Sequence, residues 1–287
     1  MKTIKSPLKK YVFNPLLLKV PLSKYDLAKL LRLEEGKQEM ETIAEVRDED
    51  GVRAACLLAS NLAKECALGE WLESGTIAEY LPLSPASAFF MHTFRRRLLG
   101  SALKLFSCHA SIDYELKFFT IIHPKWRWKS GELHNCSPRG LKKAFRRYLE
   151  RAGVVEADGL LFAAIHGEFD GEFYQLHFHG IVSGQKTLAI EKLRNNFGFV
   201  SSAAVYRPIE IVCADNLPRL LAYSLQSFWP YHLRYHDKKG KQKKKKNRQR
   251  LPNTQHREYL MWMASQNVLD LITTIGMRIK GGELKTC

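Results

Sequence analysis

The 287-residue sequence has few cysteines, and none of them lie close together. Its six cysteines are scattered without a Cys-x-x-Cys pair, which excludes a disulfide scaffold or a zinc ribbon. No apolar run is long enough for a membrane-spanning helix, and the basic N-terminal segment has only a short, proline-interrupted apolar stretch, unlike a signal peptide. We therefore expect a cytoplasmic protein that does not bind a membrane.

Acidic residues are also scarce. Asp and Glu total 29 against 45 Lys and Arg, which gives a net charge of +16 and a pI of about 9.6. Nine of the basic residues lie in residues 238–250 without an acid, and the rest of the chain stays basic without them. Such a field favours polyanions. With an ordinary globular composition, the sequence predicts a folded protein that binds nucleic acid.

The chain divides into four regions. Residues 1–110 are predicted to be helical, with helices over residues 50–66 and 87–105, and to form either a cap on the next domain or an accessory DNA-binding region. Residues 111–236 form the main domain. Residues 237–252 predict a mobile basic loop, because dense like charges repel one another. Residues 253–287 predict a C-terminal helix, with an amphipathic segment over residues 255–277.

The main domain alternates between strand and helix patterns in the order βαββαβ, followed by one more helix. This order predicts an α+β fold with a ferredoxin-like (split βαβ) antiparallel sheet, helices on one face, and the strand of residues 173–183 in the centre. Ser137 and Pro138 mark a helix start, and Asp170-Gly171 marks a hairpin. The predicted strands are 116–123, 160–169, 173–183 and 207–213, and the predicted helices are 137–152, 187–196 and 216–229.

Two histidines on one strand indicate a metal site. His177 and His179 are two residues apart, so their side chains share a face. A two-residue hairpin would pair His166 with Gln175 and place His166 and Glu168 on the same face. A bulge or slipped register, which Gly167 and Gly171 permit, would bring Glu168 nearer the pair. Packed histidines and a solvated carboxylate are the alternative.

Two imidazoles and a carboxylate suit Mg²⁺ or Mn²⁺ with open positions, and the same set can hold Zn²⁺. A cation alone does not attack phosphorus, so a nucleophile is needed. In residues 216–229, Arg219, Tyr223 and Gln226 fall on one edge of the apolar stripe. Tyr223 is either a nucleophile or a core-edge aromatic. Tyr231 and Tyr235 are weaker candidates, because Pro230 ends the helix.

Three stretches in order, FFTIIHP (118–124), LHFHG (176–180) and LLAYSLQ (220–226), resemble the motifs of the HUH endonucleases, particularly the initiators of rolling-circle replication in plasmids and phages. The resemblance spans residues 116–229. It implies that His177, His179 and Glu168 bind a divalent metal, with His166 as the alternative third ligand. It also implies that Tyr223 attacks DNA and forms a 5′-phosphotyrosine.

The implied substrate is single-stranded or extruded DNA at an origin, with a host helicase and polymerase as further partners. The initiators commonly carry Tyr-x-x-Lys, whereas this chain has Gln226 in the lysine position. Arg219 or a lysine of the basic loop is a candidate replacement. Base stacking on Trp126, Trp128 or Trp229 would suit a single strand. The candidate phosphate or DNA contacts are Arg219, Gln226, His123, Lys243, Lys244, Lys245 and Lys246.

Three other functions fit the same patterns. A transposase of the same chemistry would share the motifs. A non-catalytic nucleic-acid-binding module like an RRM would share the strand order, but it would expose aromatic side chains on its central strands. A metal-dependent hydrolase without a covalent intermediate would cleave DNA without Tyr223.

Overall fold

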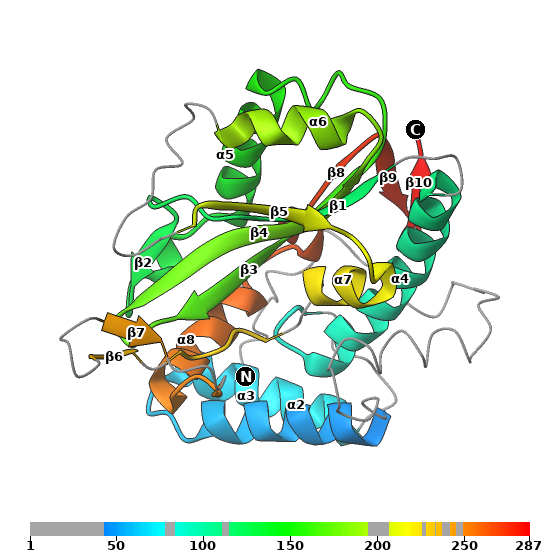
Figure 1. The fold of residues 1–287 in the computed structure, drawn as a ribbon. Helices are drawn as coiled ribbons and strands as arrows, with labels where there is room; N and C mark the ends of the chain where they lie inside the picture. The colour runs from blue at the N-terminus through cyan, green and yellow to red at the C-terminus, as the bar shows by residue number, and fades with distance from the viewer. Residues whose placement is uncertain are drawn as a thin grey trace.

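The computed structural model describes residues 43–77, 84–110, 115–194, 207–225, 228–232, 234–236, 242–244 and 249–287. It is an α+β fold built on an antiparallel sheet of strand order β5-β1-β4-β3-β8, with a short β2 paired to β4 (Figure 1). As predicted, β4 lies in the centre. The strands are β1 (Leu116–Ile121), β2 (Arg127–Lys129), β3 (Leu161–Phe169), β4 (Phe173–Ser183), β5 (Ile209–Cys213) and β8 (Ile272–Ile275).

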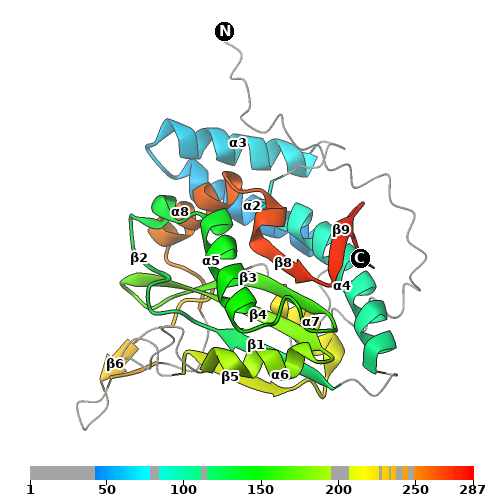
Figure 2. The ribbon, with the colours of Figure 1, turned by 90° about the horizontal axis from the view of Figure 1, so that it is seen from above.

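Helices cover both faces of the sheet. The helices α5 (Pro138–Arg151) and α6 (Lys186–Glu191) lie on one face, and α7 (Leu217–Ser224) with α4 (Ala88–Ala110) lies on the other (Figure 2). The expectation of helices on one face only is therefore wrong. The physical reason is that β3 is buried along almost its whole length, so its side chains need cover on both faces.

Alternation along β4 sends neighbouring side chains to opposite layers. The Phe178 ring stacks on Phe145 of α5 with the ring centroids 4.0 Å apart, so His177 and His179 point to the α7 side. The start of α5 is as predicted: Ser137 accepts a hydrogen bond from the Gly140 amide, and Pro138 opens the first turn. This packing fixes which face of the sheet carries the histidines.

The N-terminal region contains α2 (Ile43–Leu58) and α3 (Ala63–Ile77), so the single helix predicted over residues 50–66 is wrong. Ser60 accepts a hydrogen bond from the Leu62 amide, and this local bond competes with continuation of the helix. Asp50 of α2 accepts bonds from Ser87 and from the amides that begin α4, which caps α4 from a distant helix.

The C-terminal region is not one helix. It contains α8 (Asn253–Ala264), a 3-10 turn η4 (Val268–Leu271), strand β8, and a hairpin of β9 (Met277–Lys280) and β10 (Glu283–Thr286). The β-branched residues of β8 favour a strand, and the edge of β3 supplies its hydrogen bonds. Gly281 and Gly282 have positive φ in the hairpin turn. These long-range contacts override the amphipathic helix pattern.

Part of the predicted basic loop is also a strand. β7 (Gln242–Lys244) pairs with β6 (Arg234–His236), and Arg250 forms an ion pair with Glu49 of α2. Lys243 and Lys244 are therefore strand residues. None of the described helices combines the length and apolar character that a bilayer span requires.

Candidate metal and tyrosine site

The register of the β3-β4 hairpin decides which residues meet. Asp170 accepts bonds from the amides of Glu172 and Phe173 and from Arg127, which widens the turn beyond two residues. The register therefore slips by two residues from the simplest hairpin. His166 lies directly opposite His177, and Glu168 lies opposite Gln175. A slip of two keeps every side chain on its predicted face. It brings Glu168 two positions nearer the histidine pair, as expected of a slipped register, but His166 takes the position directly opposite His177.

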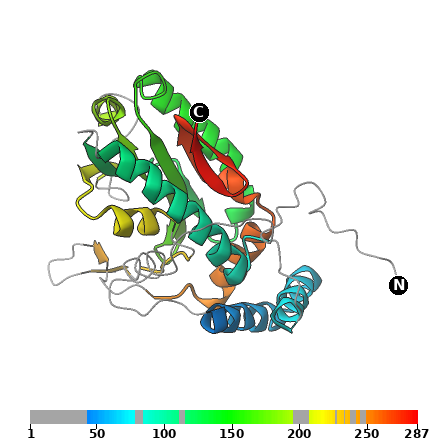
Figure 3. The same cartoon turned by 90° about the vertical axis from the view of Figure 1, so that its right-hand side faces the viewer.

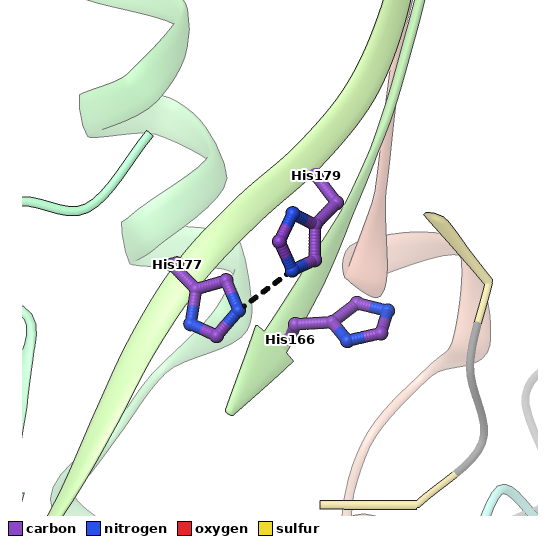
Figure 4. Close-up of side chains that lie close together, drawn as sticks. All are labelled: His166, His177 and His179. Carbon is purple, nitrogen blue, oxygen red and sulfur yellow. Dashed lines mark hydrogen bonds between the residues drawn. The ribbon is translucent and has the colours of Figure 1, made fainter. Parts of the chain in front are cut away.

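Three buried histidines form the resulting cluster (Figure 4). His166, His177 and His179 each offer one ring nitrogen, and these atoms lie within 4.8 Å of one another. The Nε2 atoms of His177 and His179 face each other at 2.9 Å. Within the described residues this is the one group of three potential metal ligands.

The outer side of each ring is held by a hydrogen bond. His177 Nδ1 lies 3.4 Å from the Gln175 carbonyl, and His166 Nε2 lies 3.2 Å from the Ser224 carbonyl. Because a carbonyl only accepts, these two nitrogens carry the hydrogen and donate. Thr120 Oγ1 lies 2.8 Å from His179 Nδ1. The two carbonyl bonds assign the tautomers of His177 and His166 and leave the other nitrogen of each ring with a lone pair, as in metal-binding histidines. The Thr120 hydroxyl holds the His179 ring in place with either tautomer.

The cluster fits a divalent cation. Two ligands about 2.1 Å from one ion and at right angles to each other are about 3 Å apart, which matches the His177 to His179 separation of 2.9 Å. Nitrogen donors favour transition-metal ions, whereas Mg²⁺ favours oxygen. Of the two ions expected from the sequence, Mn²⁺ suits three imidazoles better than Mg²⁺, and Zn²⁺ also suits them.

Glu168 does not belong to this cluster. Its carboxylate lies 3.6 Å from His232 Nε2, and its strand partner is Gln175. The choice of Glu168 over His166 as the third ligand therefore disagrees with the geometry. The physical reason is the turn at Asp170, whose hydrogen bonds set the register.

Tyr223 lies beside the cluster, as the helix pattern predicts. Its ring centroid is 4.7 Å from that of His179 and 6.0 Å from that of His166, and its side chain is half-buried. Asn216 caps the start of α7 by accepting from the Arg219 amide. The helix ends at Ser224, earlier than predicted. The Ser224 carbonyl accepts from His166, so a metal-ligand candidate holds the helix that carries the tyrosine.

Several other predicted contacts lie elsewhere. His123 is buried on the α5 side of the sheet, where its Nε2 lies 3.3 Å from the Tyr148 hydroxyl and its ring packs against Trp126. Burial lowers the pKa of His123. The expectation that His123 lines the site is wrong. Side chains alternate along a strand, so His123 shares the face of Ile121 on the α5 side and lies opposite the face of Thr120.

The remaining contact candidates divide into described and undescribed residues. Arg219 is exposed, one turn before Tyr223 on α7. Gln226, Lys245 and Lys246 lie outside the described residues, as do the side chains of Lys243, Lys244 and Tyr235. Tyr231 is half-buried and forms backbone bridges to Phe169 and Gln249.

The aromatic side chains of the central strands are not an open platform. On β1 and β4, Phe118, Phe119, Tyr174 and Phe178 are buried, and Phe173 is covered by the Arg127 guanidinium 3.8 Å from its ring centroid. Trp126 and Trp229 are core residues, which leaves Trp128, half-buried, as the most accessible of the three tryptophans considered for base stacking. These positions do not resemble the exposed stacking surface of an RRM.

Sequence reasoning missed two residues of the site, Thr120 and Ser224. Thr120 had a usable signal. It lies two residues from Phe118 on the same strand, so the two side chains share a face, and that face carries the histidines. Ser224 contributes through its carbonyl, which no side-chain pattern reveals. Comparisons of the chain with protein-family models, curated proteins and solved structures gave no match.

Proposed function

We propose that this protein nicks and rejoins single-stranded DNA as an HUH-type endonuclease, with Tyr223 as the nucleophile and a divalent cation at His166, His177 and His179. The observation that carries the proposal is the 4.7 Å between the ring centroids of Tyr223 and His179. These residues come from separate elements, α7 and β4, which meet only through the tertiary fold.

The strand order supports the finer fold assignment that the proposal needs. The strands β1 and β3 are joined through α5 and run parallel, with β4 antiparallel between them. The strands β4 and β5 are related in the same way through α6, with β1 between them. Two such interleaved units are what a split βαβ, ferredoxin-like arrangement requires, and they support that assignment. β8 is then an added edge strand.

The chemistry follows from the residues that meet. A bound cation would withdraw charge from a phosphate oxygen. The Tyr223 phenol oxygen attacks phosphorus and gives its proton to water or a base, while the bond from phosphorus to the 3′-oxygen breaks and that oxygen takes up a proton. The products are a 5′-phosphotyrosine and a free 3′-hydroxyl. Because the ester is conserved, attack by a 3′-hydroxyl rejoins the strand.

The charge of the chain supports a DNA substrate. The net charge of +16 favours a polyanion, and Arg219 is exposed one turn before Tyr223, where it can contact a phosphate. The initiators commonly have a lysine where this chain has Gln226. We infer that Arg219 takes over the role of that lysine. The biological role that fits this chemistry is initiation of rolling-circle replication of a plasmid, phage or related element.

The test uses a fully randomised pool of labelled single-stranded DNA incubated with the purified full chain and Mn²⁺. Protein-linked DNA is separated on a denaturing gel and sequenced after proteolysis. Wild type and Tyr223→Phe are compared with Tyr231→Phe, a matched control that removes a hydroxyl from another half-buried tyrosine. We expect the covalent band with wild type and Tyr231→Phe, and none with Tyr223→Phe.

Two results in which DNA is cleaved would overturn the proposal. A covalent band that persists in Tyr223→Phe would assign the nucleophile to another tyrosine. Cleavage without any covalent band, equal in all three proteins, would identify a hydrolase that uses water.

A further inference from the structure

A regular row of basic side chains lies on the outer side of α5. Arg139, Lys143, Arg147 and Arg151 recur every four residues and are all exposed. The opposite side of the helix, with Leu141 and Phe145 among its residues, is buried against the sheet. At 1.5 Å per residue the row is about 18 Å long.

Among the described residues, no acid forms an ion pair with this row. The one acid of the helix, Glu150, pairs with Arg146 at 3.0 Å. The remaining base, Lys142, donates to the Leu269 carbonyl, and Asp270 lies near it. When exposed basic side chains of this kind neutralise phosphates, they release the counterions condensed on the nucleic acid, and this release favours binding.

The surface charge is distributed unevenly over the fold. The helix α5 has six basic residues and one acid, whereas α2 has four acids and two bases, and α3 has three acids and one base. The α5 end of the molecule lies far from α2 and α3 (Figures 1 and 3). The exposed basic row therefore makes the α5 end the one that attracts a polyanion more strongly.

We propose that the row Arg139, Lys143, Arg147 and Arg151 binds the phosphate backbone of duplex DNA. Duplex is favoured over single strand because the row offers no exposed aromatic side chain for unpaired bases: Phe145 is buried, and Tyr148 stacks on His123. Backbone contacts of this kind position a duplex without reading its sequence. This inference rests on the proposed function, because the duplex bound by the row would be the part of the DNA next to the single strand held at Tyr223.

The row and the tyrosine site lie on opposite faces of the sheet. α5 packs on the face to which Phe178 points, and Tyr223 packs on the face of His179. The two contacts are therefore separable by mutation. A variant of the row should leave the histidine cluster and α7 unchanged, because its four exposed side chains lie on the outer side of α5, with the sheet between them and the site.

The experiment measures binding of a labelled duplex to the full chain by fluorescence anisotropy over a series of salt concentrations, without added metal. The test variant replaces the row by glutamine, a good helix former: Arg139→Gln/Lys143→Gln/Arg147→Gln/Arg151→Gln. The control makes the same charge change at exposed residues of α3, α4 and β9: Lys64→Gln/Lys104→Gln/Arg278→Gln/Lys280→Gln. Circular dichroism and thermal melting verify folding.

We expect the slope of log affinity against log salt to become shallower by about 3 to 4 in the row variant, since each phosphate contact contributes about 0.9. The control variant should stay within about 1 of wild type. Equal slopes in the row variant and the control would overturn the inference. A larger loss of single-strand binding than of duplex binding would also overturn it.

The covalent assay separates this inference from the proposed function. We expect the row variant to form the same covalent band on short single strands as wild type. If wild type forms no covalent band yet the row variant loses duplex affinity, the nickase proposal fails and the duplex surface stands.

Discussion

Replacing Thr120 by valine tests the metal site through a residue that touches only one ligand candidate. Thr120 lies opposite His179 in the β1-β4 register, and its Oγ1 is 2.8 Å from His179 Nδ1. Valine keeps the β-branched shape on the strand and removes the hydroxyl. The imidazole stays in place, but its orientation and tautomer lose one support.

The expected loss follows from the strength of this bond. Removing an orienting partner of a metal-binding histidine lowers metal affinity by about 10- to 100-fold, which is about 1.4 to 2.8 kcal/mol. A neutral hydrogen bond contributes about 0.5 to 1.5 kcal/mol. Thr120 is half-buried, so water partly replaces the hydroxyl. We therefore expect a loss near the lower limit, about 10-fold.

The measurement is calorimetric titration of the full chain with Mn²⁺, repeated with Zn²⁺. The matched control is Thr273→Val on β8 of the same sheet. The Thr273 hydroxyl is buried and has no hydrogen-bond partner in the described structure, so its removal breaks no bond and should leave metal affinity unchanged. Wild-type affinity in a folded Thr120→Val protein would refute the reasoning, as would an equal loss in Thr273→Val.

Three further predictions follow from the described contacts. In the same titration, His166→Ala should lower metal affinity more than about 10-fold, because it removes a ligand. Glu168→Gln should change metal affinity less than about 3-fold. The reverse order of effects would restore Glu168 as the ligand. Gly167→Ala should destabilise the fold by about 1 to 3 kcal/mol in urea unfolding, because the added methyl group would lie 2.5 Å from the Trp229 ring. The control Gly51→Ala in α2 has open space around it and should stabilise the fold by up to about 1 kcal/mol. Equal effects of the two substitutions would contradict the steric reason. Burial, reinforced by the charge of Arg53, lowers the pKa of His256 to about 4. The unfolded chain therefore binds a proton that the folded chain lacks between about pH 4 and 6.5, and stability falls as the pH drops through that range. His256→Gln should reduce that fall by about 2 kcal/mol between pH 7 and 5, and an unchanged pH profile would show that His256 is not the source.

The local signals of the main domain predicted its elements well. Ser137 and Pro138 begin α5 as expected, and the helix patterns place α7 correctly, although it ends early; α4, at the end of the N-terminal region, is also where its pattern predicts. Strand alternation assigned His166, His177 and His179 to one face. These features depend on residues a few positions apart, and the sequence contains that information directly.

Patterns near the ends of the domain were misleading. The segment after Ala264 has helical periodicity, but it forms β8 because the edge of β3 offers unpaired hydrogen-bonding groups and a buried surface. The second helical layer, with α4 and α7, covers a sheet face that the sequence pattern left open. Both outcomes depend on partners far away along the chain.

The sequence by itself determined which residue types share the α7 face of the sheet: the histidines by alternation, and Tyr223 by its place on the edge of the helix. Only the tertiary structure decided which of them meet. The Asp170 turn set a register that places His166, and not Glu168, directly opposite His177, and the packing of α7 brought Tyr223 to His179. Strand register and helix docking depend on many long-range contacts. A shift of two residues in strand pairing leaves the local strand propensity and the face of every side chain unchanged, so the local sequence does not select between the two registers.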